Sequence, residues 1–211
     1  MGRRTVLVAG ACLGSLLLLG TGGPAAASEV AVGTVIAVRG AVFADSGAGL
    51  QPLTANARIR RGDAIVSKDG KAKIALNDGT IVSVGENSRV RIADSENAPN
   101  DVRTRVSLVA GVLRLLVAIV PPAGRFEVES ETAIAAVRGT DWLIEATPER
   151  TSVAVVSGTV VVSGRGEHAR TAVVLDAHRQ GTDVRRGAAP TAPAEWGDAR
   201  FSDTLARAAF E

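Results

Sequence analysis

The 211-residue chain contains 46% hydrophobic but only 3% aromatic residues, and its formal net charge is +2 at pH 7. This balance, without any block of basic side chains, argues against a nucleic-acid-binding protein. The single cysteine excludes an intramolecular disulfide, so the fold has to be stabilised by its apolar core. The length and apolar content suit one domain of ordinary size.

Residues 1–27 have the organisation of a secretory signal peptide. Arg3 and Arg4 precede an apolar run, and Ala25–Ala27 supply small residues for cleavage. The two arginines also resemble a twin-arginine signal, so the export route stays open. Cys12 would be removed with this segment. We therefore expect the mature protein to be periplasmic or secreted.

Residues 28–186 have the pattern of an all-β domain, with short alternating runs separated by turn residues. Residues 71–76 alternate between polar and apolar, which predicts a strand with one buried face. The Asn-Asp-Gly-Thr segment at 77–80 predicts a hairpin turn. The polar segment 93–101 predicts a surface loop.

A short pattern of glycine, a small residue and then valine or leucine recurs along the chain. It begins at Gly33, Gly40, Gly111 and Gly158. The irregular intervals exclude a strict solenoid repeat. They indicate stacked short strands with glycine at the corners, where backbones approach closely. The predicted fold class is all-β, with short strands stacked in a solenoid-like or sandwich arrangement and a short C-terminal helix.

Residues 106–120 are the most apolar segment after the signal peptide. A membrane span needs about 20 apolar residues, and this run is shorter. Arg114 lies near its middle, where a charge is costly in lipid. Residues 111–115 fit a buried strand instead. We expect no transmembrane segment after signal cleavage.

Residues 187–211 predict a linker followed by a short helix. The first part is rich in alanine and proline, and Trp196, Phe201 and Leu205 fall on one face of a helix within 196–210. This apolar stripe either caps the open end of the β domain or docks into a groove of a partner. The sequence leaves both alternatives open.

A series of segments between residues 33 and 163 resembles, in the same order, the motifs of the FecR domain family. The matching positions are Gly33–Val35, Gly40–Val42, Arg61–Ser67, Gly70–Thr80, Leu108, Gly111, Phe126–Val128, Ala133, Val137–Trp142, Thr151–Val155 and Gly158–Val160. The resemblance implies a β domain of the bacterial cell envelope that senses or binds and does not catalyse.

The best-known members of this family are transmembrane regulators of iron–siderophore signalling. In them a cytoplasmic helical segment controls a sigma factor, and a periplasmic β domain recognises an outer-membrane receptor. The present sequence lacks that helical segment and an internal span, so we expect a standalone exported FecR-like protein that keeps the binding or sensing role. Its expected partner is an envelope protein.

The alternative is an envelope structural protein that binds peptidoglycan or polysaccharide. Only Trp142 and Trp196 offer indoles that could stack on sugar rings, which weighs against this alternative. An exposed Trp142 would favour glycan binding, and a buried one would favour protein binding.

The candidate partner-binding site is the run Arg138, Gly139, Thr140, Asp141 and Trp142. Gly139 permits a tight turn, and Arg138 can present a planar fork of donors to a carboxylate or phosphate. The alternative is that Arg138 is an internal clip that bonds carbonyls or an acid across the sheet.

Other chemistry-bearing residues give weaker signals. Glu127, Glu129 and Glu131 alternate and would project from one strand face, where arginines that balance them are favoured over Ca²⁺. His168 and His178 lack metal-ligand spacing. No nucleophile elbow, zinc-protease helix or P-loop occurs. We expect no metal, no cofactor and no catalytic residues, so the chain is predicted not to be an enzyme.

Overall fold

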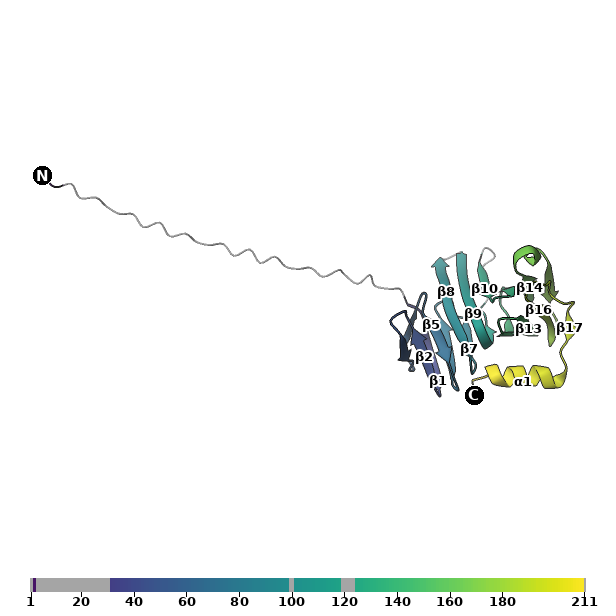
Figure 1. The fold of residues 1–211 in the computed structure, drawn as a ribbon, viewed down its shortest axis with the longest axis horizontal. Coiled ribbons are helices and arrows are strands. Elements are labelled where there is room, and N and C mark those ends of the chain that lie inside the picture. The colour runs from purple at the N-terminus through teal and green to yellow at the C-terminus, as the bar shows by residue number, and fades with distance from the viewer. Residues whose placement is uncertain (1, 3–30, 99–100, 119–123, 211) are drawn as a thin grey trace.

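The structure is a computed structural model of the 211-residue chain, and it describes residues 2, 31–98, 101–118 and 124–210. The described part consists largely of strands, with one short 3₁₀ helix and one α-helix near the C-terminus (Figure 1). This confirms the prediction of an all-β fold with a short C-terminal helix. Apart from Gly2, the predicted signal peptide at 1–27 lies outside the described residues.

The strands form two layers, which we name sheet A and sheet B. In spatial order, sheet A contains β4 (Arg58–Arg60), β1 (Ala31–Arg39), β6 (Lys71–Leu76), β7 (Ile81–Val84), the second half of β9 (Asp101–Leu116), β12 (Asp141–Ala146), β13 (Arg150–Ser157), β16 (Gln180–Arg185) and β17 (Ala194–Glu195). Sheet B contains β3 (Leu50–Pro52), β2 (Val42–Asp45), β5 (Ala64–Ser67), β8 (Arg89–Ala98), the first half of β9, β10 (Arg125–Glu129), β11 (Ala133–Val137), β14 (Val160–Gly164) and β15 (Ala172–Leu175). The 3₁₀ helix η1 (Gly166–His168) follows β14. Neighbouring strands are antiparallel except for the parallel pair β9–β10.

Strand β9 joins the two sheets at Gly111. Residues before this glycine pair with β8 and β10 in sheet B, whereas residues after it pair with β7 and β12 in sheet A. Gly111 has φ 108°, and a Cβ there would collide with Ser88. The Ser88 hydroxyl accepts a hydrogen bond from the Val112 amide at 3.0 Å and so holds the bend. Glycine is required here because the backbones approach closely at positive φ.

Glycines also occupy other corners where the chain passes between the sheets, as the sequence predicts. Gly40 (φ 69°) lies against Gly70, and a Cβ on Gly40 would come 2.9 Å from the Gly70 Cα. Gly139 (φ 100°) and Gly158 (φ 96°) form a second such pair. A Cβ on Gly158 would lie 2.9 Å from the Gly139 carbonyl oxygen. Tight corners let the two sheets stack with short connections.

The space between the sheets is filled with aliphatic side chains. Residues 71–76 alternate between partly buried and buried positions, as predicted for a strand with one buried face. The turn at 77–80 is also confirmed, with Gly79 at φ 85°. Phe126 and Trp142 are the largest fully buried side chains of this core. Each Å² of apolar surface that is buried between the sheets stabilises the fold by about 25 cal/mol.

The prediction of a polar loop at 93–101 is wrong. Strand β8 continues to Ala98 and β9 begins at Asp101, with Asp94 opposite Arg105 and Ala98 opposite Asp101. Backbone hydrogen bonds to β9 extend this hairpin. The segment lacks the alternation of apolar and polar residues by which a strand is recognised in a sequence. Residues 99–100, between the two strands, lie outside the described residues.

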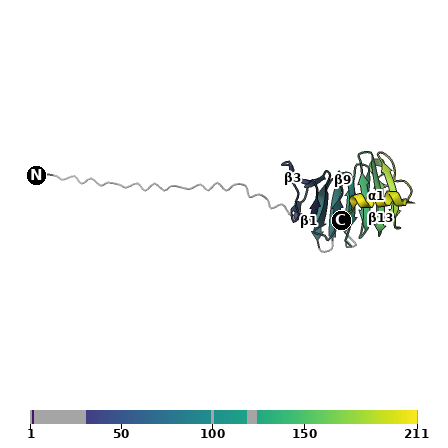
Figure 2. The same ribbon diagram turned by 90° about the horizontal axis from the view of Figure 1, so that it is seen from below.

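Helix α1 (Asp198–Ala208) lies across the outer face of sheet A and not over an open end of the sandwich. Figure 2 shows it crossing in front of the strands, and it contacts β9 and β12. Its apolar side chains join Val112, Leu143 and Ala154 of the sheet in a second apolar cluster; the buried members from the C-terminal segment are Trp196, Phe201 and Ala208. The stripe predicted from sequence therefore packs on the protein's own sheet.

Polar contacts fix the helix on this face. The Lys71 ammonium donates hydrogen bonds to the carbonyl oxygens of Ala206 (2.8 Å) and Ala209 (3.2 Å), at the end where a helix favours a cation. Arg200 pairs with Asp183 of β16 at 2.6 Å. Arg207 pairs with Glu145 of β12 at 2.9 Å.

Candidate functional site

The predicted site residues lie at the corner between β11 of sheet B and β12 of sheet A. Gly139 turns the chain at positive φ. The buried Thr140 hydroxyl donates to the Thr159 carbonyl oxygen at 2.8 Å and accepts a bond from the Thr159 amide at 3.3 Å. The backbone carbonyl oxygen of Thr140 accepts a hydrogen bond from the Val117 amide at 2.9 Å. Thr140 therefore ties this corner to the neighbouring corner and to the end of β9.

Asp141 is also engaged inside the protein. Its carboxylate oxygens accept hydrogen bonds from Arg114 Nε at 3.0 Å and Nη2 at 2.7 Å, which is a two-pronged ion pair across β9 and β12. The hydrogen bond to Asp141 raises the pKa of Arg114 above its ordinary value, against the opposing effect of partial burial. The arginine in the middle of the apolar segment 106–120 thus has its partner in the segment Val137–Trp142, one of those that resemble the FecR motifs.

Trp142 is fully buried among the aliphatic side chains between the sheets. Its indole Nε1 has no hydrogen-bond partner in the described part of the chain. The ring is inaccessible to any ligand on the surface, and by the criterion set from the sequence this favours protein binding over glycan binding.

Arg138 differs from its neighbours because its side chain is exposed. It forms no hydrogen bond or ion pair with any residue that the structure describes. The alternative that Arg138 bonds a carbonyl or an acid across the sheet therefore has no acceptor among these residues. The backbone of Arg138 is held between strand β11 on one side and the partly buried corner of Gly139 and Thr140 on the other. Of the five residues predicted for the site, only Arg138 presents an exposed charged group.

Arg138 lines an open groove of about 490 Å³ on the outer face of sheet B. The groove is lined by Gly124, Arg125, Glu127, Ala136, Val137, Arg138, Thr159 and Val161. Phe126 pairs with Val137, so extending this register by one residue places Arg125 opposite Arg138. The two arginines are thus neighbours on adjacent strands, beside the small aliphatic side chains that form the floor of the groove.

The acidic residues of β10 are balanced by arginines, as favoured from the sequence. Glu127 lies near Arg125 (3.4 Å) and Arg105 (3.9 Å). Glu129 pairs with Arg105 at 3.0 Å and with Arg165 at 3.3 Å. Glu131 lies beyond the strand, in the turn, and pairs with Arg186 at 3.0 Å. These carboxylates are therefore not free ligands.

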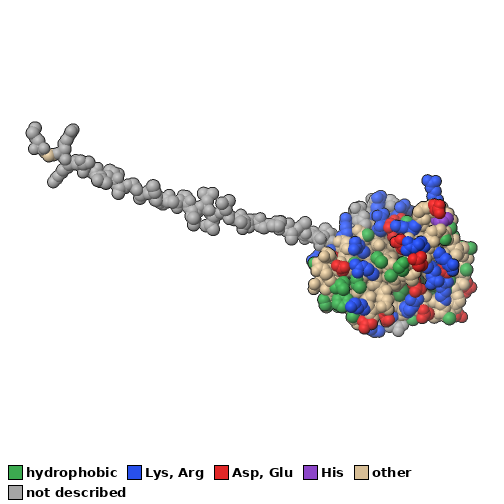
Figure 3. All heavy atoms as spheres, viewed as in Figure 1, with side chains coloured by type: hydrophobic (Ala, Val, Ile, Leu, Met, Phe, Trp, Pro, Cys, Tyr) green, Lys and Arg blue, Asp and Glu red, His purple; other side chains and the backbone are tan. Residues whose placement is uncertain are grey.

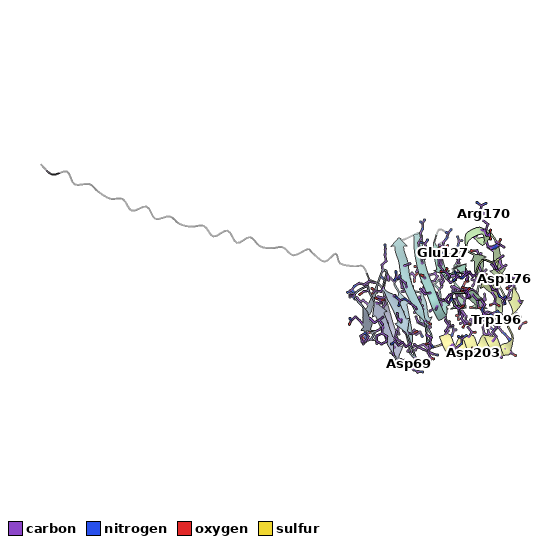
Figure 4. All side chains as sticks on the ribbon, viewed as in Figure 1. Asp69, Glu127, Arg170, Asp176, Trp196 and Asp203 are labelled. Carbon is purple, nitrogen blue, oxygen red and sulfur yellow. The ribbon has the colours of Figure 1, made fainter. Side chains whose placement is uncertain are left out.

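The groove is lined by charges of both signs, with Arg125 and Arg138 beside Glu127. Figure 3 shows basic and acidic side chains interspersed on the face in view. Figure 4 shows Glu127, a groove residue, on the opposite side of the molecule from Asp203 of α1. The groove and the helix thus belong to opposite outer faces of the sandwich.

The described ranges contain neither a metal-binding cluster nor a membrane-spanning helix. Within residues 2, 31–98, 101–118 and 124–210, no group of three or more His, Cys, Asp or Glu side chains is placed to hold a metal ion. Among the same residues, no helix has the length and apolar character needed to cross a membrane.

Residues 63–161 match the family model described as FecR protein, so the chain carries a FecR domain. The match confirms the family resemblance inferred from the ordered motifs. It spans the corner of Arg138 and the lining residues of the groove.

The fold is similar to that in two crystal structures of a candidate anti-sigma factor from Parabacteroides distasonis ATCC 8503. The TM-scores are 0.53 and 0.54 at 18% sequence identity, over 66% of this chain and 62% of the other. The chain thus spans less than two thirds of these relatives, and the likeness shows the fold alone. Comparison with curated proteins gives no match.

The sequence named Arg138 as a candidate but gave no sign of its groove neighbours Arg125 and Val161. Each is an unremarkable member of a strand, and only the pairing of β10 with β11 and of β11 with β14 brings them together. The alternation of each strand indicates that Arg125 and Val161 face the solvent. It does not indicate the order of the strands in the sheet.

Proposed function

We propose that this protein is an exported, non-catalytic binding and sensing module of the cell envelope, and that it recognises a protein partner. The observation that carries the proposal is the Arg138 groove within the FecR domain: a rigid corner holds an exposed guanidinium that no described residue neutralises. Such a group is available to an acidic ligand. The likeness in fold to a candidate anti-sigma factor supports a regulatory setting.

The proposal includes the cellular location. The signal-peptide pattern at 1–27 supports export to the periplasm or the medium. Peptidoglycan or polysaccharide is the less favoured ligand, because neither indole is available for stacking on sugar rings. Trp142 is fully buried, and the Arg200 guanidinium lies 3.6 Å from the centre of the Trp196 ring.

The absence of catalysis is also part of the proposal. The ionisable side chains that line the groove are Arg125, Glu127 and Arg138, and the carboxylate of Glu127 is already near two arginines. This arrangement supplies cations for binding and no free general base.

The test is in-cell cross-linking of the full-length, epitope-tagged chain in the bacterium that produces it, combined with cell fractionation. We expect the tagged protein in the periplasmic or extracellular fraction, without residues 1–27. We also expect one envelope protein to be captured reproducibly, compared with an unrelated exported protein that carries the same tag. Retention in the cytoplasm, or capture of sacculus material alone, would contradict the proposal.

A further inference from the structure

The strand register arranges the groove in two rows on the outer face of sheet B. Glu127 pairs with Ala136, Ala136 with Val161, and Val161 with Val174, so these four residues form one row across β10, β11, β14 and β15. The adjacent row contains Arg125, Arg138 and Thr159, by extension of the same register. Side chains in the two rows project from the same face, because residues two apart in a strand point the same way.

The arginine row has spare positive charge. Arg125 is 69% exposed, and its one acidic partner among the described residues, Glu127, lies 3.4 Å away and is shared with Arg105. Arg138 has no acidic neighbour among the described residues. Two guanidiniums against one shared carboxylate leave room for a further carboxylate between them, and planar guanidinium groups bind carboxylates well.

The aliphatic row supplies the rest of the contact surface. Ala136 is small, so the floor of the groove is low between Glu127 and Val161. Val161 is 40% exposed and Val174 is 51% exposed. The aliphatic row thus runs from the groove to the edge strand β15, which pairs with β14 alone among the described strands of sheet B. Exposed aliphatic side chains in a row favour an apolar ligand group.

We infer that this groove binds an extended peptide segment with an acidic residue and an aliphatic residue two positions apart. The carboxylate lies between Arg125 and Arg138, and the aliphatic side chain lies on Ala136 and Val161. This inference rests on the proposed function and gives the chemistry of its partner.

The distances in the sheet agree with this spacing. Arg138 and Val161 are diagonal neighbours on adjacent strands, and such positions lie about 7–8 Å apart. Side chains two residues apart in an extended peptide are separated by about 6.6 Å, twice the rise per residue. A glycan fits less well, since no aromatic side chain lines the groove and Thr159 is its only hydroxyl.

The test is fluorescence anisotropy of the mature protein with labelled short peptides that repeat the unit Glu-Ser-Val-Ser, so that glutamate and valine alternate two positions apart; this is the alternating acidic peptide. A matched peptide carries glutamine in place of glutamate, and a third has the same composition in repeats of Glu-Val-Ser-Ser, in which no glutamate and valine are two positions apart. We expect the alternating acidic peptide to bind most tightly, with weaker binding at higher salt because exposed charges are screened. Arg125→Gln and Arg138→Gln should each weaken binding about tenfold, and Val161→Thr should weaken it severalfold.

Arg58→Gln is the matched control. Arg58 is an exposed arginine on β4, which pairs only with β1 at the far edge of sheet A. We expect its affinity for the alternating peptide to be unchanged. Each variant is compared by urea unfolding, which separates a lost contact from a lost fold.

Three results would overturn the inference: no binding of the alternating acidic peptide, equal binding of the glutamine peptide, or equal losses for Arg58→Gln and Arg138→Gln. Each leaves the proposed function standing if the full-length chain still captures an envelope protein in cells. Failure of that capture, with peptide binding intact, would instead reject the proposed cellular role.

Discussion

Arg114 and Asp141 form a two-pronged ion pair across β9 and β12, with Nε–Oδ1 and Nη2–Oδ2 distances of 3.0 and 2.7 Å. The pair lies next to the corner at which Arg138 is exposed. Asp141 therefore stabilises the sheet, while Arg138, three residues earlier, is left for the solvent or a ligand. One short motif thus contains both a residue with a structural role and an exposed candidate for binding.

Asp141→Ala should destabilise the protein by about 1–3 kcal/mol, because Arg114 is only 35% exposed and would lose both of its hydrogen bonds. The expected value lies in the lower half of this range, since water reaches part of the guanidinium. Urea unfolding measures it. An Arg114→Met, Asp141→Leu double variant should recover much of the loss, and a double variant as unstable as Asp141→Ala would show that the charge is not the cause.

Arg138→Gln should leave the free energy of unfolding unchanged within about 0.5 kcal/mol, because the side chain is exposed and bonds no described residue. Urea unfolding of this variant beside Asp141→Ala makes the comparison. A loss as large as that of Asp141→Ala would show that Arg138 is an internal clip, and the groove would lose its main cation.

Gly158→Ala should destabilise the protein by about 2 kcal/mol or more. The residue has φ 96°, and the added Cβ would lie 2.9 Å from the Gly139 carbonyl oxygen. Gly47→Ala is the matched control, because Gly47 has φ 92° but nothing within 4 Å of the added Cβ. Thermal unfolding should show a smaller loss at Gly47. Equal losses would mean that backbone strain alone, and not the close corner, requires the glycine.

Trp196→Ala should cost about 3 kcal/mol, because the indole is 4% exposed and packs over Gly181 beneath helix α1. We expect the helical circular dichroism signal to fall at lower denaturant than the strand signal. Simultaneous loss of both signals would show that the helix and the sheets unfold as one unit.

Acid should release the helix through Asp183. Burial works to raise the pKa of Asp183, but hydrogen bonds from Arg200 and Ser152 and the charge of Arg200 outweigh it, so the pKa lies below its ordinary value. Because the pKa of Asp183 is lower in the folded state than in the unfolded state, the ionised carboxylate stabilises the fold at pH values above the unfolded pKa, about 3.9. This stabilisation is lost as the pH falls through the pKa of Asp183 in the folded state. Trp196 fluorescence in a Trp142→Phe background should therefore change below about pH 4.

Asp183→Asn is the control for this titration. It removes the titrating group but keeps the shape, so the acid-induced change in Trp196 fluorescence should shrink. A titration curve unchanged by Asp183→Asn would assign the transition to other carboxylates, and Asp45 is a second carboxyl whose pKa is lowered, by a backbone hydrogen bond from Gly47 and by Arg89.

The alternation of residues 71–76, the turn at Gly79 and the glycine corners at Gly40, Gly111 and Gly158 could all be predicted. Each depends on local physics: the two-residue period of a strand and the freedom of glycine at positive φ. The segment 93–101 could not, because its strand character comes from pairing with β9 and not from its own side chains.

The sequence by itself determined the family, the all-β fold class and the helix-forming stripe, because ordered motifs and periodicity are properties of the chain alone. It also named Arg138 as a candidate for binding. Only the tertiary structure decided that Asp141 pairs with Arg114, that Trp142 is buried, and that the helix covers sheet A. It also brought Arg125 and Val161 to Arg138. These relationships join residues on different strands, and strand order is set by packing of the two sheets around one core, which no local pattern specifies.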